Sequence, residues 1–351
     1  MRGVSIFLGQ RSQEQINEYL TTMKEHGFQT IFTSLHIPED DSSMYIKELK
    51  QLGEWAVQHN MELIADISPS SLSLLGSSIE IKGLSGLRID YGIGAEEIVR
   101  LSKVMRVVLN ASTLTDSFFE ELLEKGLNLA NVEAWHNYYP RPETGLAKHS
   151  FIQKNRQLKQ CGIKIAAFVP GEGEKRGPIN KGLPTLEQHR HVSPFAAAVE
   201  LWRECGVDKV IIGDPWLSKE SAQTFSTYDK GVITFRTTFL KASEPTKELI
   251  EQVHYERLDS ARDVIRSATS RSYAQTGKFH VPIVSTVERP RGSITIDNER
   301  YGRYQGELQI TKKSLPAHDA VNVVGYVVPE DQLLLDVIKP GEGFCFRCTE
   351  A

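Results

Sequence analysis

Apolar runs of strand length alternate with amphipathic segments over the first two thirds of the chain. Stretches such as QEQINEYLTTMKEHG and SMYIKELKQLGEWAVQHN repeat apolar residues at helical spacing and end in Gly or Asn, which suits a helix C-terminus. Strand and helix in alternation predict parallel strand pairing. The apolar runs number eight: GVSIFL (3–8), TIFTSLHIP (30–38), ELIADISP (62–69), GLRIDYG (86–92), VVLNAS (107–112), ANVEAWHNYY (130–139), KIAAFVPG (164–171) and KVIIGDPW (209–216).

Eight units favour a closed (β/α)8 barrel, the TIM barrel, over an open doubly wound sheet, and no GxGxxG follows the first run. After residue 228 the pattern changes to short alternating segments such as VITFRTTFL, GSITIDNERYGRYQGELQI and NVVGYVV, separated by turn signals DN, PG and PED. These segments predict a small antiparallel β-barrel, interrupted by a helix near residues 245–267. The expected domains are therefore 1–228, a catalytic barrel, and 229–351, a β-barrel.

Charge and cysteine content restrict the partners and the compartment. The chain has 351 residues, a formal net charge of −4 and no long Lys/Arg cluster, which argues against nucleic acid or an anionic membrane surface as the main partner. Neither a signal-peptide core nor a bilayer-spanning run is found, so a cytoplasmic protein is expected. A disulfide framework is not expected there, and the CFRC pair has no second CxxC or HxxxH to complete a zinc site. We predict neither a metal nor a cofactor, and a closing strand at GFCFRC.

Acidic residues stand at the ends of several predicted strands, where TIM barrels carry their catalytic groups. These strand-end acids are Asp66, Asp90 and Asp214. Because side chains alternate between the two faces of a strand, Glu133 should point into the barrel, and we expect it to reach the mouth. Paired carboxylates across a mouth suit glycoside hydrolysis, with one proton donor and one anion. The alternative for each aspartate is a helix N-cap or a structural partner to a loop amide. The alternative for Glu133 is a structural ion pair with an internal arginine such as Arg88.

Other chemistries have weaker support at these strand ends. No lysine closes a predicted strand, which argues against a Schiff-base aldolase, and neither His36 nor His136 has a partner at metal-ligand spacing. His136 lies on the face opposite to Glu133, and we assign it no catalytic role. The Gly-rich loop PGEGEKRGPINKGLPT (170–185) carries Lys175 and Arg176 and predicts an anion site, because glycines let backbone N–H groups approach a phosphate. The alternative is a surface loop with solvated charges.

Five long motifs occur in order along the chain: MRGVSIFLG, IADISP, GLRIDYG, EAWHNYYPRPETGL and ERYGRYQGELQI. Together they resemble a bacterial family once described as outer-surface proteins of unknown function (DUF871), which includes 6-phospho-N-acetylmuramidases. The resemblance covers essentially the whole chain. It implies a TIM barrel followed by a cyclophilin-like β-barrel, and cytoplasmic cleavage of the β-1,4 bond between N-acetylmuramic acid 6-phosphate and N-acetylglucosamine during recycling of cell-wall sugars.

The resemblance does not assign roles to individual residues, so the site prediction combines it with the strand-end pattern. We expect Asp66 and Glu133 to be the catalytic carboxylates, with Asp90 the next choice. A substrate-assisted route through the 2-acetamido group stays open. The anionic disaccharide also needs cations, and the ERYGRYQGE hairpin is a candidate to close the mouth. The expected substrate-binding residues are His36, Asn110, Asn137, Tyr138, Arg141, Lys175, Arg176, Asp214, Arg300 and Arg303.

Two other functions fit parts of the same pattern. A barrel phosphosugar isomerase or epimerase would share the strand-end acids and the anion loop, but would release no new reducing end. A non-catalytic binding or peptidyl-prolyl module would use the β-rich C-terminal half. The sequence predicts no oligomeric state.

Overall fold

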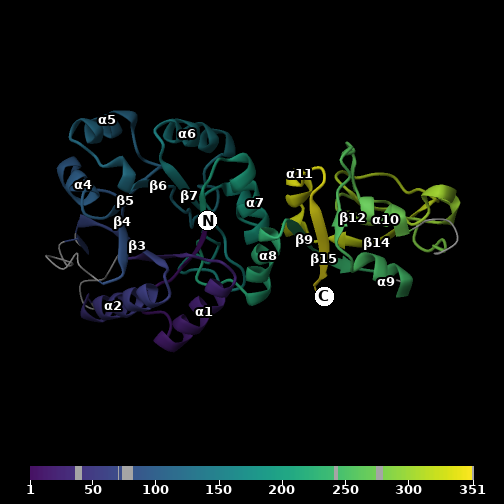
Figure 1. The fold of residues 1–351 in the computed structure, drawn as a ribbon, viewed down its shortest axis with the longest axis horizontal. Coiled ribbons are helices and arrows are strands. Elements are labelled where there is room, and N and C mark those ends of the chain that lie inside the picture. Colours follow the sequence, from purple (N-terminus) through teal and green to yellow (C-terminus); the bar gives the residue numbers. More distant parts are fainter. Residues whose placement is uncertain (36–41, 70, 73–81, 241–243, 274–279, 350–351) are drawn as a thin grey trace. The chain divides into compact units, whose positions relative to one another are not determined.

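The computed structural model describes residues 1–35, 42–69, 71–72, 82–240, 244–273 and 280–349, and the chain divides into two compact units (Figure 1). The first unit is Met1–Ala222 and the second is Gln223–Ala351. The division falls inside helix α8 (Lys219–Asp229), whereas the sequence-based boundary lies near the end of that helix. In the described part of the chain, no helix combines the length and the apolar character needed to cross a membrane.

The first unit is a closed barrel of eight parallel strands in sequential order, as the alternating pattern predicts. Each strand pairs with the next, and β1 pairs with β8 to close the ring. The strands are β1 (Arg2–Ser5), β2 (Thr30–Ser34), β3 (Glu62–Ile67), β4 (Leu84–Ile89), β5 (Arg106–Asn110), β6 (Val132–Trp135), β7 (Lys164–Val169) and β8 (Lys209–Ile212). The helices around them are α1 (Gln13–Glu25), α2 (Ser42–Gln58), α4 (Ala95–Ser102), α5 (Asp116–Glu124), α6 (Lys148–Gln160), α7 (Pro194–Glu204) and α8, with short 3-10 helices η3 (Leu129–Asn131) and η4 (Glu187–His189).

The helix boundaries follow from local sequence. Ser12 caps α1 through a capping box with Gln15, and Ser193 followed by a proline starts α7. Just after α1 and α2, Gly27 and Asn60 have φ angles of 79° and 52°, which are left-handed conformations that these two residue types tolerate best. The Gly and Asn positions chosen from the sequence as helix ends are therefore confirmed.

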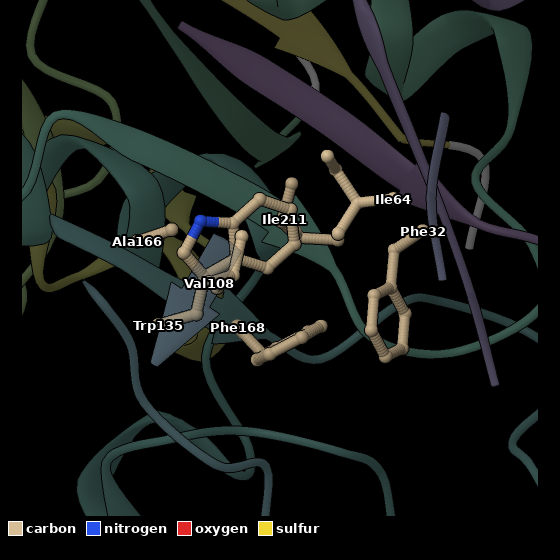
Figure 2. Packing of buried hydrophobic residues seen from close by; sticks show 7 residues of the cluster. All are labelled: Phe32, Ile64, Val108, Trp135, Ala166, Phe168 and Ile211. Carbon is tan, nitrogen blue, oxygen red and sulfur yellow. The ribbon is translucent and has the colours of Figure 1, made fainter. Parts of the chain in front are cut away.

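Alternate residues of the strands fill the barrel interior (Figure 2). Trp135 packs there with Phe32 and Phe168, and the last two rings meet edge to face with centroids 5.1 Å apart. Burial of such rings is the main favourable contribution to barrel stability. Because every second side chain of a strand points inwards, other residues face the barrel interior on either side of this apolar layer. Polar residues at the strand starts line one end of the barrel, and polar residues at the strand ends line the other.

The second unit is a seven-stranded, nearly closed sheet in the order β10-β15-β9-β14-β12-β13-β11. An isolated bridge between Glu256 and Ser267 connects the two outer strands. The strands are β9 (Val232–Phe239), β10 (His254–Tyr255), β11 (Val264–Arg266), β12 (Ser293–Asp297), β13 (Leu308–Thr311), β14 (Val321–Val327) and β15 (Gly343–Cys348). The helices are α9 (Glu244–Ile250), α10 (Ala268–Tyr273), α11 (Leu334–Val337), η5 (Glu299–Tyr304) and η6 (Pro329–Asp331).

Two expectations for this unit need correction. The helix predicted over 245–267 ends at Ile250, and the rest of that segment contains β10 and β11, because its residues HY pair with β15 and its residues VIR pair with β13. The barrel is also not fully antiparallel, since β15 runs parallel to β9. The strand predicted at GFCFRC is confirmed as β15. Cys345 and Cys348 are three positions apart in this strand, so their thiols point to opposite faces.

A buried pair of acids at the end of β12 makes the stability of the second unit depend on pH. Asp297 and Glu307 are both almost fully buried. Burial, with Glu307 adding repulsion, raises the pKa of Asp297 to about 8. The folded state therefore keeps this proton at pH values where the unfolded chain has lost it.

We expect the contribution of this single proton to the stability of the second unit to fall as pH rises from about 4 to about 8, by about 1.4 kcal/mol per pH unit. Asp297→Asn removes this contribution, so the variant should gain stability relative to wild type over this range and be the more stable protein at pH 8.5. Melting temperatures of both proteins from pH 5 to 9 provide the measurement. Parallel curves for the two proteins would contradict the assignment.

Candidate active site

The carboxyl ends of β3 to β6 bring five polar side chains together at one end of the barrel. Asp66 and Arg88 are direct neighbours on β3 and β4, and Arg88 Nη1 donates to Asp66 Oδ1 at 2.8 Å. The same nitrogen lies 3.5 Å from Asp90 Oδ1, and Nη2 donates to Asn137 Oδ1 after β6. Asn110, the last residue of β5, donates through Nδ2 to Asp90 Oδ1 at 3.0 Å. We call these five residues the mouth cluster.

The two carboxylates of the mouth cluster differ in their surroundings. Asp66 is buried, and its side chain is only 5 % exposed. The Asp90 side chain is 27 % exposed and forms part of the wall of a cleft beside the mouth. Because both acids contact one guanidinium nitrogen, their nearest oxygens are held within about two hydrogen-bond lengths of each other. The cluster therefore offers one enclosed anion and one solvent-accessible carboxyl group.

Glu133 lies at the opposite end of the barrel, which corrects the expectation that it reaches the mouth. It is buried among charges from the strand starts: Lys209 Nζ lies 3.1 Å from Glu133 Oε2, and Arg106 Nη1 lies 3.4 Å from Oε1. Trp135 Nε1 donates to Oε2 at 2.8 Å, and Glu62 binds both cations. Burial raises the pKa of Glu62, but Lys209 and Arg106 outweigh this effect and lower it to about 2.

The position of Glu133 follows from the length of its strand. Period two correctly turns Glu133 into the barrel, but β6 covers only Val132–Trp135, so Glu133 is its second residue. The apolar ring of Trp135 separates it from the mouth cluster. The alternative weighed from the sequence, a structural ion pair, describes its surroundings, although Lys209 and Arg106 take the place of Arg88. Arg88 instead stands at the centre of the mouth cluster.

The loop after β7, residues 170–185, is organised around Asp214, which follows β8. Asp214 is fully buried and accepts hydrogen bonds from the backbone N–H groups of Gly171 at 2.8 Å, Arg176 at 3.1 Å and Leu183 at 3.2 Å. A side chain at Gly171 would come within 2.7 Å of the Asp214 Cβ, so only glycine permits this approach. The loop amides thus bind an internal carboxylate. This position does not support Asp214 as a substrate ligand and gives it the role of holding the loop.

Because Asp214 occupies these backbone amides of the loop, the loop's cationic side chains are the groups left to bind an external anion. The Arg176 guanidinium stacks on the Phe7 ring at 3.9 Å, and its Nη1 donates to the Tyr138 hydroxyl at 2.7 Å. Burial raises the pKa of Tyr138, so its hydroxyl stays a neutral partner of Arg176. Lys175 donates to the Gly171 carbonyl, and burial lowers its pKa against the opposing effect of Asp214. Arg176 is therefore fixed at the barrel mouth.

The remaining predicted residues have different positions. His36 lies outside the described residues. Arg141, in the loop after β6, has an exposed side chain, and its carbonyl accepts from Arg190. Arg300 and Arg303 belong to the second unit, in η5 between the paired strands β12 and β13. Arg300 Nη1 forms an ion pair with Asp319 at 2.8 Å, and the Arg303 guanidinium lies 4.9 Å from the centre of the Tyr304 ring. Their roles as anion ligands stay predictions.

His136 points away from the mouth, as period two predicts. Its Nε2 lies 2.7 Å from Asn155 Oδ1, and its ring packs on Phe151 of α6. Burial lowers the pKa of His136 to about 4, so the ring is neutral at pH 7. These contacts give His136 a packing role between β6 and α6.

Sequence reasoning missed the central position of Arg88 and the supporting role of Ser112. Arg88 and Asp90 are two residues apart in GLRIDYG and so share one face of the strand, a signal that links them before the fold is known. Ser112 Oγ accepts a hydrogen bond from the Asn137 backbone N–H at 2.9 Å. No sequence pattern connects these two residues, because only the pairing of β5 with β6 brings their loops together.

Comparison with known proteins identifies relatives over the whole chain. The family model described as 6-phospho-N-acetylmuramidase, N-terminal, matches residues 2–227, and the model described as 6-phospho-N-acetylmuramidase, C-terminal, matches residues 233–347. A solved structure of a conserved Enterococcus faecalis protein of unknown function is 41% identical, with a TM-score of 0.88 over 99% of this chain and 96% of that one. An uncharacterised B. cereus protein is 29% identical, with a TM-score of 0.75 over 99% of both chains. The comparison with curated proteins gave no match.

Proposed function

This chain belongs to the 6-phospho-N-acetylmuramidase family of glycoside hydrolases, and we propose that it hydrolyses the β-1,4 bond between N-acetylmuramic acid 6-phosphate and N-acetylglucosamine. The observation that carries the proposal is the mouth cluster, which holds Asp66 and Asp90 on one guanidinium, with the Arg176 side chain fixed over Phe7 at the same end of the barrel. Two close carboxyl groups and a nearby cation are what hydrolysis of an anionic glycoside requires. We place the reaction in the cytoplasm, in recycling of cell-wall sugars.

The proposed roles follow from the surroundings of each acid. Asp90, which reaches solvent, donates a proton to the glycosidic oxygen as the bond to the anomeric carbon breaks. Asp66, enclosed beside Arg88, supports the positive charge that develops at the anomeric carbon, directly or by orienting the 2-acetamido group of the substrate. Asn110 holds Asp90 in place by donating a hydrogen bond to its carboxylate. Asn137 accepts a hydrogen bond from Arg88, and Arg88 in turn binds Asp66. A water molecule then adds its hydroxyl to the anomeric carbon in place of N-acetylglucosamine and gives its other proton to the Asp90 carboxylate, which restores the proton donor.

Product analysis by mass spectrometry tests the proposal. The purified chain is incubated with N-acetylmuramic acid 6-phosphate linked β-1,4 to N-acetylglucosamine, and in parallel with the unphosphorylated disaccharide. We expect release of both sugars from the phosphorylated substrate only. A phosphorylated sugar of unchanged mass but altered chromatographic retention would favour an isomerase or epimerase instead. No reaction with either disaccharide would contradict the proposal.

Arg176 is the proposed ligand of the substrate 6-phosphate, with Lys175 beside it. Arg176→Ala should lower kcat/KM for the phosphorylated disaccharide by about 10²-fold, because a charge-assisted pair with phosphate is lost. Arg176→Lys should lose less, since the charge remains while the planar stack on Phe7 is gone. Lys181→Ala, an exposed cation of the same loop, is the matched control. An equal loss in the control and in Arg176→Ala would point to loop disorder instead of phosphate binding.

A further inference from the structure

A cleft of about 230 Å³ opens beside the mouth cluster, between the carboxyl ends of β4 and β5 and the helices α4 and α5. Its floor is apolar and includes Ile98, Leu114 and Phe118. Asp90 and Asn110 form the wall that it shares with the mouth cluster. The cleft therefore begins at the proposed proton donor and leads away from the centre of the barrel.

The rim of the cleft has the chemistry of a site for a neutral sugar. Tyr91 lines the cleft and is 64 % exposed, so one face of its ring is available to stack on a pyranose. Thr113, also exposed, adds a hydroxyl, and the apolar floor suits the methyl of an acetamido group. Among the described residues that line the cleft there is no Lys or Arg, and Asp90 brings negative charge. A phosphate or a lactyl carboxylate is disfavoured here.

The cationic side of the mouth lies across the barrel. In a ring of eight strands in sequential order, β4 and β5 stand opposite β8 and β1. The Arg176 backbone is bound to Asp214 after β8, and its guanidinium covers Phe7 after β1. The mouth is thus polarised, with a fixed cation on one rim, the mouth cluster in the middle and, on the opposite rim, a cleft whose described lining contains no Lys or Arg.

We propose that this cleft is the leaving-group subsite and binds the N-acetylglucosamine half of the substrate, while the phosphorylated half lies towards Arg176. This inference rests on the proposed function and adds the direction in which the disaccharide crosses the barrel. In that direction the glycosidic oxygen lies next to Asp90, which stands at the boundary between the mouth cluster and the cleft.

The test compares two substrates that share the phosphorylated half. One is the disaccharide, and the other is 6-phospho-N-acetylmuramyl β-fluoride, whose leaving group is too small to occupy the cleft. Tyr91→Ala removes the stacking face, and Thr113→Trp fills the cleft from an exposed position, so neither should prevent folding. Tyr255→Ala, at an exposed tyrosine of β10 outside the cleft, is the control.

We expect Tyr91→Ala and Thr113→Trp to lower kcat/KM for the disaccharide by about 10-fold or more, and to leave fluoride release within about twofold of wild type. Equal losses on both substrates would place the phosphorylated half in the cleft and overturn the inference. Unchanged hydrolysis of the disaccharide by both variants would also overturn it. If folded wild-type protein cleaves neither substrate, the proposed function itself fails. If wild type cleaves both substrates but the variants do not distinguish between them, only the inference about the cleft fails.

Discussion

Asp66→Asn is expected to reduce kcat by about 10³-fold or more on both the disaccharide and the β-fluoride, because the developing positive charge loses its enclosed anion whatever the leaving group. Asn has nearly the same shape, and the Arg88 guanidinium keeps its contacts with Asp90 and Asn137. Steady-state rates with both substrates are the measurement. A loss of less than about tenfold would remove Asp66 from the mechanism.

Glu133→Gln provides the matched control, since it also neutralises a buried carboxylate inside the same barrel. Glu133 contacts Lys209 and Arg106 at the far end of the strands. We expect this variant to lose about 3 kcal/mol of unfolding free energy, because among the described residues Glu62 is then the one acidic partner left to Lys209. The kcat should stay within a few fold of wild type. If kcat falls as far as in Asp66→Asn while the protein remains folded, the chemistry would have to be assigned to the other end of the barrel.

Asp90→Asn is expected to show a dependence on the leaving group that Asp66→Asn lacks. Loss of a general acid costs about 10²- to 10⁴-fold when the leaving group is a sugar alkoxide that must be protonated. Fluoride departs with far less need of a proton, so the β-fluoride should be cleaved by Asp90→Asn at a rate close to that of wild type. Equal losses on the two substrates would assign Asp90 a different role, such as binding.

The strand-end acids show how far the sequence alone reaches into the site. Asp66 and Asp90 are predicted from their place after apolar runs, and the structure does bring them together. Glu133 also belongs to an apolar run, yet the structure places it near the start of its strand, at the end of the barrel away from the mouth. Period two reports which face of a strand a residue occupies, but it does not report how far along the strand the residue lies.

The loop after β7 illustrates the same limit for anion binding. Its glycines and cations predict an anion site, and three of its backbone N–H groups do bind a carboxylate. That carboxylate is Asp214 of the chain itself, which approaches from the end of β8. Local composition encodes the capacity of the loop to bind an anion, whereas the identity of the anion depends on a residue that is distant in sequence.

The amino-acid sequence by itself determined the eight alternating units, the change to a β-rich second unit and the inward face of each strand, because these features depend on the local spacing of apolar residues. Only the tertiary structure decided which polar side chains share an end of the barrel. Strand pairing sets the height of each side chain along the barrel axis, and it placed Arg88 between two acids and Glu133 among the strand-start charges. That height depends on contacts between residues far apart in the chain, which no local pattern records.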